Sequence, residues 1–198
     1  MRMTTIVIVI LLGLLLVFWT VGAWSRLAAM RGAQRAAFAR IDEQIRHRHA
    51  LIPGLVETAG GYLPQERASL EEIIEARNAA MAACSRAASD PGDADAMRGL
   101  VGAEALLTAT MSRLAALSAA CPALAENIHR GEIDAELTST EHRLAFARQA
   151  YNDAVAHYNR ALAQFPGSIL ARASGLQQAE PLQATMSPLD RRQGRAGS

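Results

Sequence analysis

The stretch from Met3 to Ser25 contains no charged side chain, and most of its residues are Ile, Leu, Val, Phe or Trp. A helix rises about 1.5 Å per residue, so about 20 such residues cross the roughly 30 Å hydrocarbon core of a bilayer. Phe18, Trp19 and Trp24 lie near the end of the stretch, where aromatic side chains favour the membrane interface. The sequence therefore predicts a transmembrane anchor over residues 1–25, with the lipid bilayer as its partner.

A cleaved signal peptide is the alternative interpretation, since Val21-Gly22-Ala23 offers small residues at offsets that suit signal peptidase. The apolar stretch is long for a signal peptide, and helical periodicity resumes almost directly after it. An anchor is therefore the favoured interpretation.

Arginines are distributed unequally around this stretch. Only Arg2 precedes it, whereas four arginines follow it before the first acidic residue: Arg26, Arg31, Arg35 and Arg40. Positively charged flanks stay in the cytoplasm. We therefore expect a single-pass protein of the cell inner membrane, with its N-terminus outside and its body in the cytoplasm.

The rest of the chain is rich in alanine, which favours helix. All 20 basic residues are arginine, 19 acidic residues are interspersed among them, and the net charge is +1. This balance predicts no basic face for nucleic acid.

In a helical hairpin around Pro91, Cys84 and Cys121 would lie about 33 Å apart. A disulfide needs Cα atoms within about 7 Å, so we expect two free thiols.

The segment from Ile133 to Phe165 has the clearest pattern. Its apolar positions are spaced by four or three residues for over four heptads, as in a coiled coil or a bundle helix. These seam positions are Ile133, Leu137, Thr140, Leu144, Ala147, Tyr151, Ala154, Tyr158, Leu162 and Phe165, with a shift of the seam to Val155 after Ala154 as the alternative.

Three further helices are predicted from similar patterns. The last helix is preceded by a short connection over residues 122–131, either wholly irregular or with one helical turn. Short links make neighbouring helices antiparallel, so the fold class is all-α, an up-down-up-down bundle with coiled-coil-like packing on one N-terminal membrane helix. The bundle should occupy residues 26–172, and residues 173–198, which lack periodicity, should be disordered. The three helices cover residues 38–62, 64–88 and from Asp93 or Asp95 to Cys121.

Pro53 lies inside the first of these helices. It removes one backbone hydrogen bond and should kink the helix near Ala50 and Leu51. Between Trp24 and Phe38 only Gly32 disfavours helix. We therefore expect the membrane helix to continue into the bundle as one rod.

Four motifs follow one another along the chain. Residues 48–57 match a pattern R-x-x-L-I-P-x-L-V-E. Glu75-Ala76-Arg77 forms a short E-A-R motif in the second helix. Residues 141–152 match E-x-R-L-A-x-A-R-x-x-Y-N, which includes Arg148, and Val155, Tyr158-Asn159 and Phe165-Pro166 come after it. In this order the motifs resemble the LemA family of bacterial membrane proteins, over roughly residues 5–175, with Gly54 where many relatives carry Asn. The resemblance implies a helical bundle on a single span and no established biochemical activity.

Arg48 occupies a seam position of the first bundle helix, and Arg77 is a candidate seam residue of the second. A buried guanidinium is costly unless it is paired and hydrogen-bonded. We expect an ion pair that fixes helix register, or alternatively a polar pocket for an anionic partner. The candidate partners are Glu57, Glu104, Glu136 and Glu141, among which the sequence does not choose.

Tyr151-Asn152 and Tyr158-Asn159 repeat at seven residues, and Phe165 completes the stripe. Tyrosines at this spacing share one helix face. Core packing, with the amides bonded to neighbouring helices, is the first interpretation. A groove for a partner helix is the second, because Asn at such positions often specifies pairing.

Glu126-x-x-His129 has the form of a di-iron bundle ligand pair, but such sites need two copies and two further glutamates. We therefore expect no metal and no cofactor.

These features favour a non-enzymatic scaffold or adaptor of the cell envelope, which binds other membrane or envelope proteins or a second copy of itself. A signal-transducing or ligand-sensing bundle is the alternative, and a metalloenzyme bundle is a third hypothesis. The residues expected to set register or to interact are Arg48, Pro53, Glu57, Arg77, Glu141, Arg148, Tyr151, Asn152, Tyr158, Asn159 and Phe165.

Overall fold

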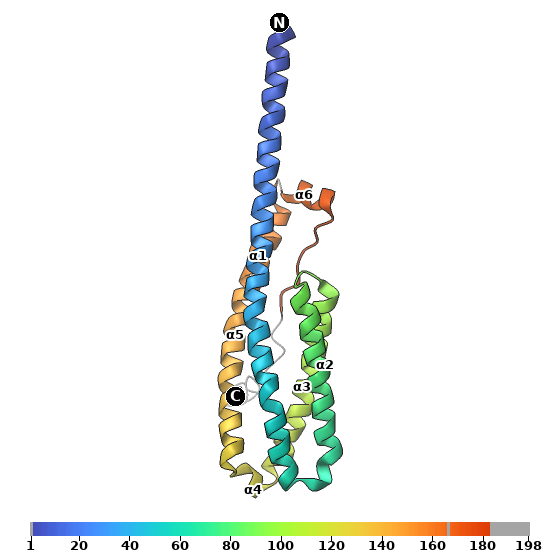
Figure 1. Ribbon diagram of the computed structural model, residues 1–198, viewed down its shortest axis with the longest axis vertical. Coiled ribbons are helices and arrows are strands. Elements are labelled where there is room, and N and C mark those ends of the chain that lie inside the picture. Colours follow the sequence, from blue (N-terminus) through green and yellow to red (C-terminus); the bar gives the residue numbers. More distant parts are fainter. Residues whose placement is uncertain (1, 166, 183–198) are drawn as a thin grey trace, which may run out of the picture.

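The computed structural model describes residues 2–165 and 167–182, and this part of the chain contains helices and no strand. The long helices stand side by side around a shared core, and the N-terminal helix projects far beyond it (Figure 1). In chain order the elements are α1 (Arg2–Tyr62), the 3-10 turn η1 (Pro64–Glu66), α2 (Arg67–Ser89), α3 (Ala94–Ala119), α4 (Pro122–Ala125), α5 (Ile128–Ala163) and α6 (Gly167–Ser174).

Helix α1 is one unbroken helix of 61 residues, about 90 Å long at the usual helical rise. The large apolar side chains described between Met3 and Val21 are exposed, and burial begins at Leu27. The prediction that the apolar stretch continues into the bundle as one rod is confirmed. The helix also runs through Pro53, which is exposed on its outer face.

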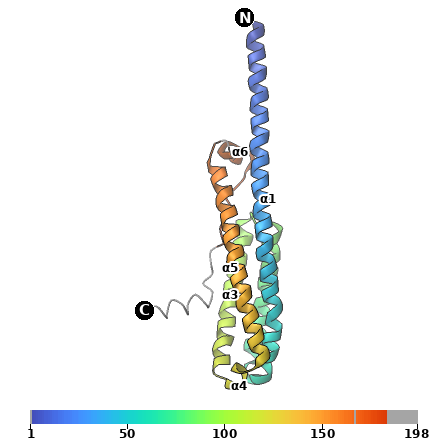
Figure 2. The same ribbon diagram turned by 90° about the vertical axis from the view of Figure 1, so that its left-hand side faces the viewer.

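The four long helices alternate in direction, as predicted. Helix α1 descends, α2 returns, α3 descends and α5 returns beside α1 (Figure 1). Helix α1 packs mainly on α5 and on α2, and α2 packs on α3. The view turned by 90° also places α1 and α5 side by side (Figure 2).

The helix boundaries differ from prediction mainly around residues 122–131. This connection contains α4, and α5 begins at Ile128 instead of Ile133. The Asn127 side chain caps α5 by accepting the N–H of Arg130, a cap that extends the helix by a turn. For α3 the structure selects Asp93 as the cap, whose carboxylate accepts the N–H groups of Asp95 and Ala96.

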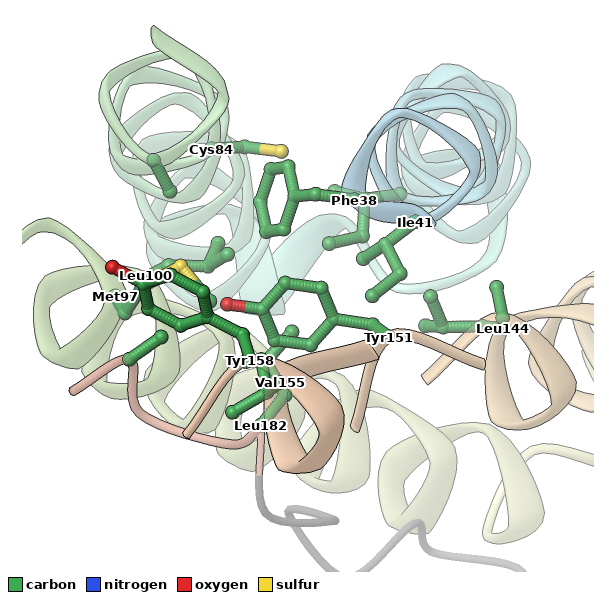
Figure 3. Packing of buried hydrophobic residues seen from close by; sticks show 14 of the residues in the cluster. Phe38, Ile41, Cys84, Met97, Leu100, Leu144, Tyr151, Val155, Tyr158 and Leu182 are labelled. Atoms are coloured by element: carbon green, nitrogen blue, oxygen red, sulfur yellow. The ribbon is translucent and has the colours of Figure 1, made fainter. Parts of the chain in front are cut away.

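The core consists of two hydrophobic clusters. The cluster nearer the projecting end of α1 contains Phe38, Ile41, Leu144 and both buried tyrosines (Figure 3). The distal cluster, at the α4 end, consists of Ile52, Leu55, Ala59, Leu63, Leu70, Ile73, Ala76, Ala80, Leu107, Leu114, Leu124 and Ile133.

Both cysteines are free, as expected. Cys84 is buried in the cluster nearer the projecting end, where its thiol donates to Asp42 Oδ1 at 3.1 Å. Burial, and then Asp42, raises the pKa of this thiol to about 12. Cys84 therefore behaves as a small core residue and not as a nucleophile.

The C-terminal segment differs from the prediction of disorder from residue 173 onward. Helix α6 ends at Ser174, and Gly175 follows with a φ of 67°. The N–H of Leu176 then bonds the Ala171 carbonyl at 3.1 Å, which is the six-to-one bond of a Schellman cap. Ala179 and Leu182 are buried in the same cluster as Phe38. Residues 183–198 lie outside the described part of the chain.

Within the described part of the chain, two helices are long and apolar enough to cross a membrane, α1 and α3. Helix α3 packs along α2 and contributes Leu100, Leu107 and Leu114 to the core. In contrast, the apolar window of α1 has no buried residue. The N-terminal part of α1 is therefore the candidate membrane span.

Candidate functional site: a charged centre between two hydrophobic clusters

A layer of charged side chains separates the two hydrophobic clusters. Arg48 of α1 contacts Glu104 of α3, and Arg48 Nη1 donates to Glu141 Oε1 of α5 at 2.7 Å. The Arg48, Glu104 and Glu141 side chains are 11, 10 and 20% exposed. Ion pairs this deeply buried interact strongly but have a large desolvation cost. This arrangement ties three helices together at one level.

His49, the neighbour of Arg48 on α1, belongs to the same layer. Its side chain is 1% exposed, and its Nε2 lies 3.0 Å from Glu104 Oε1. Burial, and then the charges of Arg48, Arg77 and Arg46, lower the pKa of His49 to about 3. His49 is therefore neutral near pH 7.

Helix α2 joins the centre through Arg77. Pro53 has no N–H, so it leaves the His49 carbonyl, four residues earlier, without its helical donor. Arg77 Nε donates to this carbonyl at 2.9 Å. Two arginines, Arg48 and Arg77, thus balance the carboxylates Glu104 and Glu141.

Several buried atoms of this centre lack aligned hydrogen bonds among the described residues. They include Arg48 Nε, both ring nitrogens of His49 and both carboxylate oxygens of Glu104. Glu104 lies at ion-pair distance from Arg48 and His49, so its interactions are close but poorly aligned. A buried charged network has a large desolvation cost, so its contribution to stability depends on how completely its groups are paired.

Of the four candidate partners for the arginines, the structure selects two. Glu104 and Glu141 pair with Arg48. Glu136 instead contacts His47 and Arg143 at the surface, and Glu57 is exposed on α1. Glu57 therefore takes no place in the charged centre.

His49 was missed by the sequence interpretation, although a signal existed. It lies four residues after Ile45 and three before Ile52, and both isoleucines are buried seam positions. Arg48 lies three residues after Ile45, so the line of seam positions runs between Arg48 and His49. Arg148 lies half-buried on α5, seven residues beyond Glu141, and makes an interaction of its own.

The asparagines of the Tyr-Asn repeat hold the C-terminal segment and not a neighbouring helix. Asn159 donates to the Ala179 carbonyl at 2.9 Å and accepts the Ala179 N–H at 3.0 Å. Asn152 makes the same pair of bonds with Leu182, at 3.0 and 2.9 Å. Seven residues of helix rise about 10.5 Å, and three residues of extended chain span about 10 Å. The heptad spacing of the asparagines thus matches a nearly extended segment.

The tyrosines of the repeat are both buried. Tyr151 packs edge-on against Phe38, with ring centroids 5.7 Å apart. Its hydroxyl donates to the Pro91 carbonyl at 3.1 Å and accepts from Gln34 at 3.3 Å. The Tyr158 hydroxyl is buried without a hydrogen-bond partner among the described residues. Tyr151 therefore connects α1 and α5 to the turn between α2 and α3.

Phe165 does not extend the seam. Helix α5 ends at Ala163, and the Phe165 side chain is 70% exposed. Its ring lies against Trp19 of α1, with centroids 5.0 Å apart. Phe165 thus belongs to the junction between the bundle and the apolar stretch.

A metal centre finds no support in the described residues, where no group of three or more His, Cys, Asp or Glu side chains converges. His129 of the Glu126-x-x-His129 motif lies 3.6 Å from Glu132 at the surface.

The described helices form an all-α, antiparallel bundle that contains a charged layer and is continuous with a long apolar N-terminal helix. A family model described as "LemA family" matches residues 37–192, which is most of the chain. The chain belongs to the LemA family. The matched region contains the charged centre, the C-terminal segment, and Asn152 and Asn159, which hold that segment and are here called the asparagine latch. No curated protein matches the chain.

Proposed function

We propose that this protein is a non-enzymatic scaffold or adaptor, anchored in the cell inner membrane by the N-terminal part of α1. The observation that carries the proposal is the continuity of α1. One helix joins the exposed apolar stretch to Arg48 and His49 without a break. A rod of this kind holds the bundle at a fixed distance from its anchor.

The sidedness of the anchor follows from the arginines. Four arginines of α1, between residues 26 and 40, follow the apolar stretch, and the positive-inside rule favours a cytoplasmic location for them. The proposed arrangement therefore has the N-terminus outside and the bundle in the cytoplasm.

The charged centre suits a scaffold because it fixes the register of four helices. Its two arginines and two glutamates are engaged with one another or with backbone, and a shift of one helix would leave a buried charge unpaired. Its function in this proposal is to hold the outer faces in one arrangement.

Partner proteins would bind those outer faces. Three large apolar side chains of α3 and α5 are more than half exposed: Leu106 of α3 and Ile128 and Phe146 of α5. Apolar and aromatic side chains of this kind are typical anchors of protein interfaces. The proposed partners are envelope proteins or a second copy of the chain.

Site-specific photo-crosslinking in intact cells tests this proposal. A photoreactive phenylalanine analogue at Phe146 should yield the same crosslinked envelope protein, or a crosslinked dimer, in repeated experiments. Gln149, which is exposed on the same helix, provides the control position. If the membrane-inserted protein crosslinks to no protein from positions 106, 128 and 146, the scaffold proposal is wrong.

A ligand-sensing bundle is the second candidate function. The supporting observation is the set of buried, unaligned polar atoms around Arg48 and His49. An anionic ligand bound there would raise the unfolding temperature. Arg48→Met separates the two candidates: a scaffold loses register, whereas a sensor loses the ligand-dependent shift while it retains or gains stability.

A further inference from the structure

The corner between α5 and α6 lies beside the apolar part of α1. Phe165 stacks on Trp19, and a groove of about 390 Å³ separates the two chain segments. One wall of the groove comes from α1 between Leu15 and Leu27, and the other from residues Ala161 to Gly167. The end of the bundle therefore overlaps the stretch that is proposed to cross the membrane.

The overlap has a simple consequence for depth. Trp19 precedes Arg26 by seven residues, which is about 10 Å of helix on the apolar side of that arginine. The headgroup region adds only about 5–7 Å on each side of the hydrocarbon core. If α1 spans the bilayer, side chains at the level of Trp19 reach the outer part of the hydrocarbon.

The chemistry of the corner suits this environment. Residues 161–176 contain no acidic side chain, and Arg172 is their single basic one. Phe165 and Ile169 are 70 and 58% exposed. On α1, Arg26 lines the groove at the end that would face the headgroups. Exposed apolar side chains with arginines beside them are typical of segments that lie in a membrane interface.

The backbone holds α6 crosswise at this level (Figure 1). Gly167 packs so closely on the Ala161 carbonyl that a Cβ atom would collide with it. The chain can therefore turn sharply from α5 into α6. Leu170 and Ala171 of α6 face the core, which leaves Ile169 and Arg172 outward.

We propose that the α5–α6 corner is a second membrane contact. Phe165 and Ile169 enter the outer acyl region of the leaflet on the bundle side, a phospholipid acyl chain fills the groove, and Arg26 and Arg172 bind headgroup phosphates. This proposal rests on the membrane anchor proposed above. It adds a second attachment point, which prevents α1 from rotating about its own axis in the bilayer.

Depth-dependent fluorescence quenching tests the contact on the full chain. Single-cysteine variants in a Cys84→Ala, Cys121→Ser background carry an environment-sensitive fluorophore at position 169, with position 165 as the second site. Phe146→Cys is the matched control, since Phe146 is 76% exposed on α5 but distant from the groove. Leu12→Cys reports insertion of α1. The proteoliposomes contain phosphatidylcholine and phosphatidylglycerol with bromine at shallow or deep acyl positions.

The expected result is several-fold stronger quenching at positions 165 and 169 than at 146, with shallow bromines more effective than deep ones, while position 12 responds best to deep bromines. Quenching at 165 and 169 no greater than at 146, with position 12 still quenched, overturns the corner contact alone. Loss of quenching at position 12 as well overturns the anchor, and the corner contact with it.

Discussion

Arg77 Nε on α2 donates a 2.9 Å hydrogen bond to the backbone carbonyl of His49 on α1. That carbonyl has no helical donor because the residue four positions later is Pro53. The break in the backbone bonding of α1 thus becomes an attachment point for the neighbouring helix. It also explains how α1 stays continuous through Pro53.

The first prediction concerns this attachment. Arg77→Met should lower the free energy of unfolding by about 1–3 kcal/mol, because the His49 carbonyl loses the donor that Arg77 supplies. In a Pro53→Ala background the helical N–H is restored, so the same substitution should cost less. Urea or thermal unfolding of the four proteins of this cycle, in detergent, measures the coupling. Strictly additive effects would show that Pro53 and Arg77 act independently.

The second prediction concerns Glu104. Glu104→Gln should destabilise the bundle by about 1–3 kcal/mol, because Arg48 loses one buried counter-charge and keeps the other, Glu141. Glu136→Gln is the matched control: its partners His47 and Arg143 lie at the surface, and this substitution should have a much smaller effect on stability. Unfolding curves of both variants provide the comparison. Equal costs would contradict the account of the charged centre.

The third prediction concerns pH. The pKa of His49 is lowered from 6.5 to about 3 in the folded state, so the unfolded state binds the proton first as the pH falls. Above about pH 6.5 His49 is neutral in both states, and the free energy of unfolding has its full value. Below that pH the free energy of unfolding decreases, by about 2 kcal/mol at pH 5. His49→Gln should remove this part of the pH dependence between pH 7.5 and 5. An unchanged slope in the variant would mean that His49 does not titrate in this way.

The fourth prediction concerns the asparagine latch. Asn152→Ala removes both bonds to Leu182, and Asn159→Ala removes both bonds to Ala179. Each substitution should speed amide hydrogen exchange of the segment around residues 179–182 by about tenfold or more. Gln149→Ala, on the exposed face of α5, is the control. Exchange that stays slow in both Asn variants would show that apolar burial alone holds the segment.

The helices, their alternating directions and the continuous α1 were predictable from the sequence. Each depends on local information: seam spacing, capping residues and short connections. Arg48 was recognisable for the same reason, as a charge at a seam position. Its choice of Glu104 and Glu141 was not, because four glutamates satisfied the sequence criteria and only the rotation and height of α3 and α5 distinguish them.

The C-terminal segment was not predictable from periodicity. This segment is nearly extended and is held by side chains of a helix distant from it in the sequence. Its apolar residues therefore follow neither the 3.6-residue period of a helix nor the pattern of a strand beside a partner strand. Its signals were indirect: glycines at 167 and 175 bracketing one short helix, and asparagines at 152 and 159 whose spacing fits an extended chain. Phe165 was misplaced because the four-and-three pattern continues past the residue where α5 ends.

Whether the N-terminal part of α1 is an uncleaved membrane anchor is tested most directly by recovering the intact chain from cells and determining where it resides. Alkaline carbonate extraction, followed by intact-mass measurement and by cysteine labelling of Thr4→Cys and Phe146→Cys, gives location, processing and sidedness together. The account predicts a full-length chain in the carbonate-resistant membrane pellet, with position 4 labelled from outside and position 146 only after the cytoplasmic side is opened. A full-length chain in the soluble fraction, or a mature chain that begins after Ala23, would contradict it.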